Sequence, residues 1–365
     1  MLTLCKFCNS ANKNFFPEGE CFLCEGKLES IDSLIEKAAG EIERYPSFSV
    51  STKIPKKWLA REETLWDFNL DGAESIKTHA NRYINGELNR KTGKKFGPDG
   101  DIRVIFDIDR GEVGTELNGL FVFGRYRKLI AGISQTRWTC KKCNGKGCEK
   151  CSGKGKMYES VEEKIGGIMK KEADAKDYTM HASGREDIDV VTTAKRPFVM
   201  QLGEAKNRKP DLKKIENEIA KGKEVAVSDL KIVKRSAVEL VSSSHFDKEY
   251  EAEVEFEEEP GKEQIDAVLS LEGKTIAQKT PERVAHRRAN LIRRRKILGV
   301  KLVSKDGNKA KFRIKTEAGT YIKELITGDE GRTEPNFSSL AGMKVACANL
   351  EVVEIEDEFL KETVG

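Results

Sequence analysis

The sequence lacks several features that mark membrane proteins and nucleotide-dependent enzymes. None of its 365 residues belongs to an apolar run approaching the roughly 20 residues needed to span a bilayer. Residues 1–5 do not have the layout of a signal peptide. The chain also has no Walker loop, no Gly-x-Gly-x-x-Gly after a strand and no Ser-Gly-Gly nucleotide loop. We therefore expect a soluble, cytoplasmic protein with no membrane partner, and these absences count against a dependence on ATP or a methyl donor.

Histidine and net charge are also scarce. The four histidines have no partners at metal-ligand spacing, so no histidine-based metal site is expected. The formal net charge is only +4, and overall charge therefore does not indicate a nucleic-acid partner. The distribution is more informative, because residues 283–296 are densely basic and residues 250–259 densely acidic. The basic run is suited to binding phosphates.

Cysteine is the first informative residue that is present. Eight of the nine cysteines form four Cys-x-x-Cys pairs, and the last two pairs are direct copies of Cys-x-x-Cys-x-Gly-x-Gly. In a cytoplasmic protein this spacing favours structural zinc over disulfides. The main expectation is one four-thiolate site from the first two pairs and a second from the last two, but an exchange of pairs between the two groups remains open. Cys347 is expected to be a core thiol. The expected ligands are Cys5, Cys8, Cys21, Cys24, Cys140, Cys143, Cys148 and Cys151.

The stretch of residues 181–189, His-Ala-Ser-Gly-Arg-Glu-Asp-Ile-Asp, combines a flexible backbone with charge. Gly184 can adopt a backbone conformation that other residues rarely take, and Arg185 supplies a fixed cation. Asp187 and Asp189 are two residues apart, so an extended strand would place both on one face. A carboxylate in such a setting can be a nucleophile or a general base. By itself, however, the cluster also fits a solvated surface turn.

Hydrophobic periodicity predicts a mixture of helices and strands, and hence an α+β fold. We expect helices from Ser30 and from Pro281. The other expected helices are 73–87, a helix after the capping box at 160–163, and 211–221, and the expected strands are 48–51, 101–109, 120–123, a strand-rich 225–240, 248–256 and 311–315.

The Gly-Arg-x-Asp run at residues 184–187 resembles the active-site loop of pseudouridine synthases. Together with Arg196-Pro-Phe-Val, residues 124–138 and residues 278–341, it resembles the archaeal tRNA pseudouridine 54/55 synthase family. The resemblance implies an N-terminal zinc-bound, THUMP-containing RNA-binding region and a catalytic domain with a mixed, largely antiparallel sheet. The implied regions are a zinc knuckle module at 1–30, a THUMP-like domain at 31–138, a second zinc module at 139–158 and the catalytic domain at 159–365.

The resemblance also implies an activity, the isomerisation of uridine in the T-arm loop of tRNA at position 54, 55 or both. No organic cofactor is needed for this reaction, tRNA is the partner, and we expect a monomer. Asp187 is the implied catalytic residue, acting as nucleophile or by abstracting a sugar proton. Tyr250 is expected to stack on the base, Tyr321 to lie near the base or ribose, and Lys323 to pair with Asp187. Arg185 completes the expected substrate-binding set.

RNA contacts are expected from two basic segments. In the first, cations neutralise phosphates and a tyrosine stacks on a base. Residues 191–195 lack the arginine and glycines usual in the family, so Lys195 and Arg196 are expected to supply that charge. The predicted RNA-binding residues are Arg125, Tyr126, Arg127, Lys128, Arg283, Arg287 and Arg288.

Two alternative functions remain open from the sequence. The repeated Cys-x-x-Cys-x-Gly-x-Gly resembles the zinc repeats of DnaJ-class chaperones, although no J-domain motif is present. A non-catalytic, zinc-stabilised tRNA-binding or chaperone protein is therefore the main alternative. The other is a different THUMP-bearing modification enzyme, which the missing cofactor loops disfavour.

Overall fold

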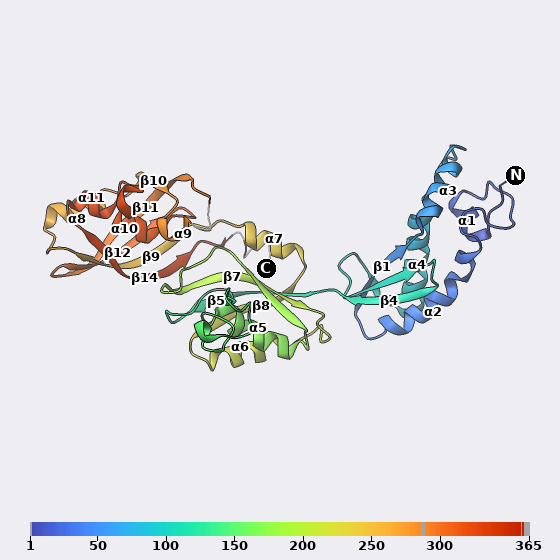
Figure 1. The fold of residues 1–365 in the computed structure, drawn as a ribbon, viewed down its shortest axis with the longest axis horizontal. Helices are drawn as coiled ribbons and strands as arrows, with labels where there is room; N and C mark the ends of the chain where they lie inside the picture. The colour runs from blue at the N-terminus through green and yellow to red at the C-terminus, as the bar shows by residue number, and fades with distance from the viewer. Residues whose placement is uncertain (1, 286–288, 359, 361–365) are drawn as a thin grey trace. The chain divides into compact units, whose positions relative to one another are not determined.

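The computed structural model describes residues 2–285, 289–358 and 360, and the chain forms two compact units (Figure 1). The first unit comprises Met1–Leu120, Ala173–Asp177 and Leu202–Lys209, and the second comprises Phe121–Glu172, Tyr178–Gln201 and Pro210–Gly365. This division differs from the predicted boundary after residue 138. Because the strand that begins at Leu120 pairs within the sheet of the second unit, residues 121–138 and the second cysteine group belong to that unit.

The first unit packs helices against a four-stranded sheet of order β2-β1-β3-β4. Strand β1 is parallel to β2 and β3, whereas β3 and β4 are antiparallel. The apolar side chains that predicted the helix after Ser30 are all buried in it. The elements are α1 (Lys6–Ala11), η1 (Lys27–Ser30), α2 (Ile31–Ile42), β1 (Ser47–Lys53), α3 (Lys56–Trp66), α4 (Ile76–Thr92), β2 (Lys95–Phe96), β3 (Ile102–Asp107) and β4 (Glu112–Leu117).

The second unit is built on a ten-stranded sheet whose main path runs β13-β10-β11-β12-β9-β14-β7-β5-β8, with β6 paired to β7. Most of its ladders are antiparallel, but β14 and β7 are parallel, so the sheet is mixed as predicted. Its strands are β5 (Leu120–Lys128), β6 (Asp177–Ala182), β7 (Val191–Gly203), β8 (Val225–Val233), β9 (Lys248–Phe256), β10 (Thr275–Lys279), β11 (Ile292–Asp306), β12 (Lys309–Thr316), β13 (Thr333–Glu334) and β14 (Val345–Ile355).

Helices of the second unit lie along this sheet, with α5 and α6 near β8 and with α8, α10 and α11 around the strands β11 to β14 (Figure 1). Ser160 caps the amide of Glu163 at 3.2 Å, and Asp211 caps that of Lys214 at 2.9 Å, as their sequence positions predict. The helical segments are η2 (Glu149–Cys151), α5 (Val161–Glu172), α6 (Leu212–Ala220), α7 (Ser236–Ser243), α8 (Lys262–Leu269), α9 (Glu282–Ala285), α10 (Ile322–Thr327), η3 (Asp329–Gly331) and α11 (Phe337–Ala341).

One local prediction is wrong. The strand-rich segment predicted at 225–240 ends at Val233, and α7 follows it, because Ala237 and Val241 pack one helical face into the core. The helix predicted from Pro281 is present as α9, and the cations of residues 293–296 lie on strand β11. Pairing with β10 provides the backbone hydrogen bonds of that strand. Among the described residues, no helix combines the length and apolar character required to cross a membrane.

Candidate active site

The central loop joins β6 to β7, and residues 184–190 are not the extended strand that the two aspartates suggested. Gly184 has a φ of 72°, in the left-handed region that favours glycine. A Cβ at this position would lie 3.2 Å from Nη1 of Arg196. The loop therefore turns tightly against a buried arginine, and a side chain at position 184 would strain both.

A buried polar network lies beneath this loop. Nε of Arg196 is 3.0 Å from Oε2 of Glu186, and both side chains are only 1% exposed. The hydroxyl of Tyr126 donates to both carboxylate oxygens of Glu186 at 2.9 Å. Nε2 of Gln135 donates to the carbonyl of Gly184 at 3.0 Å. Burial alone would lower the pKa of Arg196, but the charge of Glu186 outweighs it and the pKa is raised. The loop thus lies on a fully buried pair of an arginine and a glutamate.

Lys128 fixes the part of the loop that carries the aspartates. Its fully buried ammonium group donates to the carbonyls of Ile133 at 3.0 Å, Asp187 at 2.9 Å and Ile188 at 3.0 Å. Three acceptors match the three donors of a lysine. The buried lysine therefore fixes the backbone carbonyl of Asp187, while the carboxylate of Asp187 contacts a different cation.

The side chain of Asp187 pairs with Arg283, which the sequence had assigned to RNA binding. Nη1 of Arg283 lies 2.8 Å from Oδ2 of Asp187, and its Nε lies 2.6 Å from Oε1 of Glu324. Glu324 is buried, whereas a third of the Asp187 side chain is exposed. Burial would lower the pKa of Arg283, but the hydrogen bond and charge of Glu324 raise it overall. Asp187 is consequently an accessible carboxylate beside a permanent cation.

The expected pairing of Lys323 with Asp187 is replaced by another. Nζ of Lys323 lies 2.5 Å from Oδ2 of Asp189, whose side chain is 68% exposed. Lys323 is the second residue of α10, and Arg283 on α9 occupies the position beside Asp187. The two aspartates therefore have different cations, because the loop turns between them instead of continuing as a strand.

These residues surround one cavity of about 560 Å³, within the range of about 300–1,000 Å³ usual for ligand pockets. It brings together the predicted site residues Arg185, Asp187, Tyr250, Arg283, Tyr321 and Lys323. Sequence reasoning missed several further lining residues that the fold adds to them. These include Glu186, Lys248, Arg293 and Arg295, and also Arg196, which had been expected to face RNA. The cavity is rich in cations, as a site for a phosphate-bearing molecule should be.

The aromatic residues reach the cavity from two elements. Tyr250 lies on β9 opposite Ile314 and Val352, and burial raises the pKa of its hydroxyl to about 12. It is therefore a neutral phenol near pH 7. Tyr321 precedes α10, and the buried amide of Gln278 holds its backbone, accepting from the nitrogen and donating to the carbonyl at 2.9 Å each.

Lys248 lies two residues before Tyr250 on the same strand, so the alternation of β9 offered a signal for it. Its side chain is buried and donates to the carbonyl of Phe246 at 2.8 Å. Burial, followed by the charge of Arg196, lowers its pKa from the ordinary 10.5 to about 8. The amine thus titrates close to neutral pH beside the cavity.

A pH dependence of stability follows from Lys248. Between pH 8 and 10.5 the unfolded chain keeps a proton that the folded chain has lost, so this group makes unfolding harder as pH rises. The full rise in the free energy of unfolding is about 3 kcal/mol, since one pKa unit corresponds to about 1.4 kcal/mol. Between pH 7.5 and pH 10, the free energy of unfolding measured with urea is expected to rise less for Lys248→Met than for the wild type. Equal rises in the two proteins would contradict the lowered pKa.

The first basic segment does not present the predicted RNA-binding surface. Arg125, Tyr126 and Lys128 are 7%, 0% and 0% exposed, and of that group only Arg127 is exposed. Nε of Arg125 lies 2.6 Å from Oδ2 of the buried Asp357. Eight of the nine residues of β5 are buried, so side chains on both faces of this strand meet protein. The prediction of direct RNA contact is therefore wrong for these three residues.

Lys195 and Arg196, which were expected to supply charge to RNA, lie in different environments. Arg196 is buried against Glu186, so it cannot replace the missing charge at the RNA surface, whereas Lys195 is exposed and lies 3.8 Å from Asp229. The predictions for Arg287 and Arg288 lie outside the described residues.

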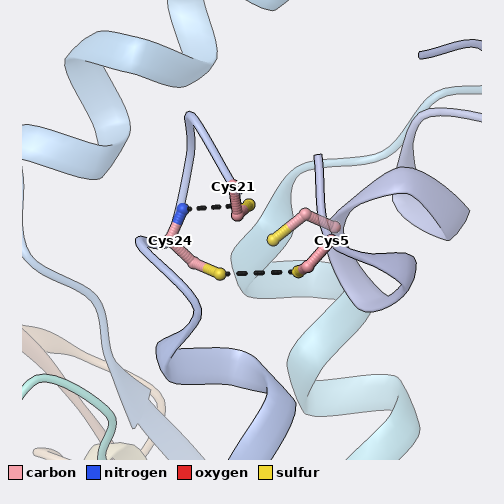
Figure 2. A group of neighbouring side chains, drawn as sticks. Cys5, Cys21 and Cys24 are labelled. Carbon is pink, nitrogen blue, oxygen red and sulfur yellow. Dashed lines mark hydrogen bonds between the residues drawn. The ribbon is translucent and has the colours of Figure 1, made fainter. Parts of the chain in front are cut away.

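The eight paired cysteines converge in two groups, without exchange of pairs between them. Within each group the four sulfurs lie within 4.8 Å of one another. Thiolates each about 2.3 Å from a tetrahedral zinc lie about 3.8 Å apart. The sulfurs of Cys5 and Cys24 are 3.6 Å apart (Figure 2), and those of Cys140 and Cys148 are 3.8 Å apart. Both donor sets therefore suit a metal such as zinc.

The second group also shows why its repeats contain glycine. Gly147 has a φ of 90°, and a Cβ there would lie 2.6 Å from the carbonyl oxygen of Gly153. Gly155 makes the equivalent close approach to the carbonyl of Gly145. The two copies pack backbone against backbone around the sulfurs, which any side chain at these positions would prevent.

Comparison with known proteins identifies the family. The family described as "Pus10, C-terminal" matches residues 121–356. The tRNA pseudouridine synthase Pus10 of Korarchaeum cryptofilum is 36% identical over 347 residues, covering 92% of this chain and 93% of the relative. That of Archaeoglobus fulgidus is 35% identical, covering 97% and 100%. That of Methanocaldococcus jannaschii is 39% identical, covering 94% and 76%.

Solved structures show a more distant likeness. A crystal structure of a Cbf5-Nop10-Gar1 complex matches with a TM-score of 0.36 and 17% identity, covering 66% of this chain and 56% of that chain. The family match spans most of the second unit, and the curated relatives span nearly the whole chain. The chain therefore belongs to the Pus10 family of tRNA pseudouridine synthases, which are isomerases.

Proposed function

We propose that this chain isomerises uridine in the T-arm loop of tRNA, at position 54, 55 or both, and that Asp187 is the catalytic carboxylate. The observation that carries the proposal is the position of Asp187 in the cationic cavity, 2.8 Å from Arg283 and in a cavity shared with Tyr250. Among the carboxylates of the cavity, Glu186 is buried in an ion pair with Arg196 and is therefore inaccessible to a substrate. Asp187 is thus the lining carboxylate that is accessible and fixed.

The target uridine has to enter the cavity outside its stack, because its reacting atoms are inaccessible within a folded loop. The cations around the cavity suit the phosphates that flank an extruded nucleotide. Arg185, Arg293 and Arg295 are proposed to contact them, since all three line the cavity, the first from the central loop and the other two from β11. Tyr321 is proposed to lie along the base or ribose.

The reaction breaks the bond between the ribose C1′ and uracil N1 and forms one between C1′ and C5. N1 gains a proton and C5 loses one, so the conversion needs no redox partner or external group. Asp187 either attacks the sugar or abstracts a sugar proton, and both roles use its carboxylate, which lies 2.8 Å from the guanidinium of Arg283. Tyr250, a neutral phenol in the cavity, is proposed to stack on uracil and to move a proton.

The remaining parts are proposed to bind tRNA and to maintain the fold. The first unit is proposed to be a THUMP-containing region that recognises tRNA by shape and phosphate contacts. Each cysteine group is proposed to hold one structural zinc ion, because a closed set of four thiolates leaves no open position for a substrate.

The test is release of tritium from tRNA labelled at C5 of uridine, with purified protein and no added cofactor. Isomerisation must expel that label, so we expect release in proportion to the number of target uridines. Transcripts carrying cytidine at position 54, at position 55 or at both then assign the target. Release that persists from the doubly substituted transcript would exclude the T-arm assignment, and no release from any tRNA that still binds would exclude catalysis.

A further inference from the structure

We propose that the second cysteine group, when it holds its metal, positions Arg185 in the cavity through the ring of Trp138. The metal module is defined here as residues 139–158. The inference rests on the proposed function only in that Arg185 is taken to contact the substrate. The physical link between the module and Arg185 stands on contacts within the second unit.

Arg185 lies over an aromatic ring at one side of the catalytic loop. Its guanidinium carbon is 5.5 Å from the centroid of the Trp138 ring, within the range of a cation–π interaction. Arg185 itself is exposed and lines the cavity. A long side chain in that situation loses considerable rotamer entropy when it is fixed. The contact with the indole face therefore contributes to fixing the position of this cation.

Trp138 is in turn held by the metal module. Its carbonyl accepts from the amide of Met157 at 2.9 Å, and its ring meets that of Tyr158 at 5.4 Å between centroids. Thr139 and Lys156 form an antiparallel bridge, and the amide of Cys140 donates to the carbonyl of Gly155. The two ends of the module are thus paired, and Trp138 is fixed by that pairing.

The pairing of the ends depends on what holds the rest of the module together. Residues 139–156 contain no valine, leucine, isoleucine, methionine or aromatic residue, so the segment has no hydrophobic core of its own. Six of them are lysines, which repel one another. The segment instead has four converging cysteine thiols, which can hold it together by binding a metal ion. In such modules the free energy of metal binding is the free energy of folding.

The loop backbone is anchored separately from this link. Gln135 and Lys128 bind the carbonyls of Gly184 and Asp187 from beneath. The amide of Arg137 donates to buried Glu162 on α5 at 2.9 Å. Loss of the metal is therefore expected to free the Trp138 ring and the Arg185 side chain while Asp187 keeps its place. The consequence is weaker substrate binding more than slower chemistry.

The first experiment measures modification of the Arg185 guanidinium by phenylglyoxal, located by mass spectrometry, which needs no activity. Cys148→Ser/Cys151→Ser and Trp138→Leu are each expected to speed this modification about five-fold, since loss of the cation–π contact makes the guanidinium more accessible. Trp138→Tyr keeps an aromatic face and is expected to match the wild type. Modification of Arg196, whose side chain is 1% exposed, reports whether the second unit remains folded and should not change.

The second experiment measures tRNA turnover by the same proteins, with bound zinc determined for each. Trp138→Leu is expected to keep the wild-type zinc content and to lose about ten-fold in kcat/KM, mainly through KM, with recovery in Trp138→Tyr. Unchanged modification of Arg185 in the double cysteine variant would overturn the proposal, as would a parallel rise at Arg196. If wild-type protein releases no tritium but the modification pattern holds, the proposed function fails and the link stands.

Discussion

Asp187→Asn is expected to abolish tritium release from C5-labelled tRNA, a fall of at least about 10³-fold in kcat. The amide is nearly the same size as the carboxylate but can neither attack the sugar nor take a proton from it. Arg283 keeps its 2.6 Å contact with Glu324 in the variant, so the cation is not stranded. Because a third of the Asp187 side chain is exposed, stability should change by less than about 1 kcal/mol.

Asp189→Asn provides the matched control on the same loop. Its carboxylate is 68% exposed and pairs with Lys323, so the substitution removes the same charge two residues away. We expect it to retain at least about a tenth of the wild-type rate, because it alters only an exposed ion pair. Binding of tRNA, measured by gel shift, should persist in both variants. Full activity in Asp187→Asn with loss in Asp189→Asn would reverse the assignment.

Of the single substitutions proposed for the second unit, Arg196→Met is expected to lower the free energy of unfolding most. It leaves Glu186 buried without its cation, and breaking one partner out of a buried pair costs about 3–5 kcal/mol. Methionine fills much of the same volume, so the loss reflects charge more than a cavity. The loop above would lose the donor to the Ser183 carbonyl as well, at 3.0 Å in the intact protein. Urea unfolding at pH 7 measures the change.

Two comparisons separate this effect from the loss of any arginine. Arg313→Met removes an arginine that is 44% exposed and pairs with Glu251 at 2.7 Å, and it should cost less than about 1 kcal/mol. Arg196→Met/Glu186→Gln should recover part of the loss, because the stranded charge is removed. Equal costs for Arg196→Met and Arg313→Met would refute the role assigned to the buried pair.

Local sequence signals predicted many elements of the fold correctly. The periodicity after Ser30 gave α2, and the alternation from Lys248 gave β9 with Tyr250 on its inner face. These signals are reliable because each of these elements buries one face, so apolar residues recur along its sequence at the spacing of that face. The helix α7 escaped detection because its short apolar run fits either a helix or a strand.

The sequence identified several residues of the candidate site but not which of them form ion pairs with one another. Arg283 and Lys323 were both identified, but their partners among the two aspartates were not, since a turn in the loop separates Asp187 from Asp189. The sequence provided a weak indication that Glu324 belongs to the site, because it is an acidic residue within the apolar run of α10. An acid there needs a cation when it is buried, but the sequence does not show which cation the fold supplies.

By itself, the sequence determined the four Cys-x-x-Cys pairs, the Gly-Arg-x-Asp loop and the elements whose apolar pattern repeats along the chain, because each depends on residues close together. The tertiary structure alone decided that the cysteines group as first with second and third with fourth. It also turned a basic strand end into a buried support, with Tyr126 and Lys128 beneath the loop instead of at the RNA surface. The physical reason is that burial and ion pairing depend on which distant strands become neighbours, and β5 lies between β7 and β8.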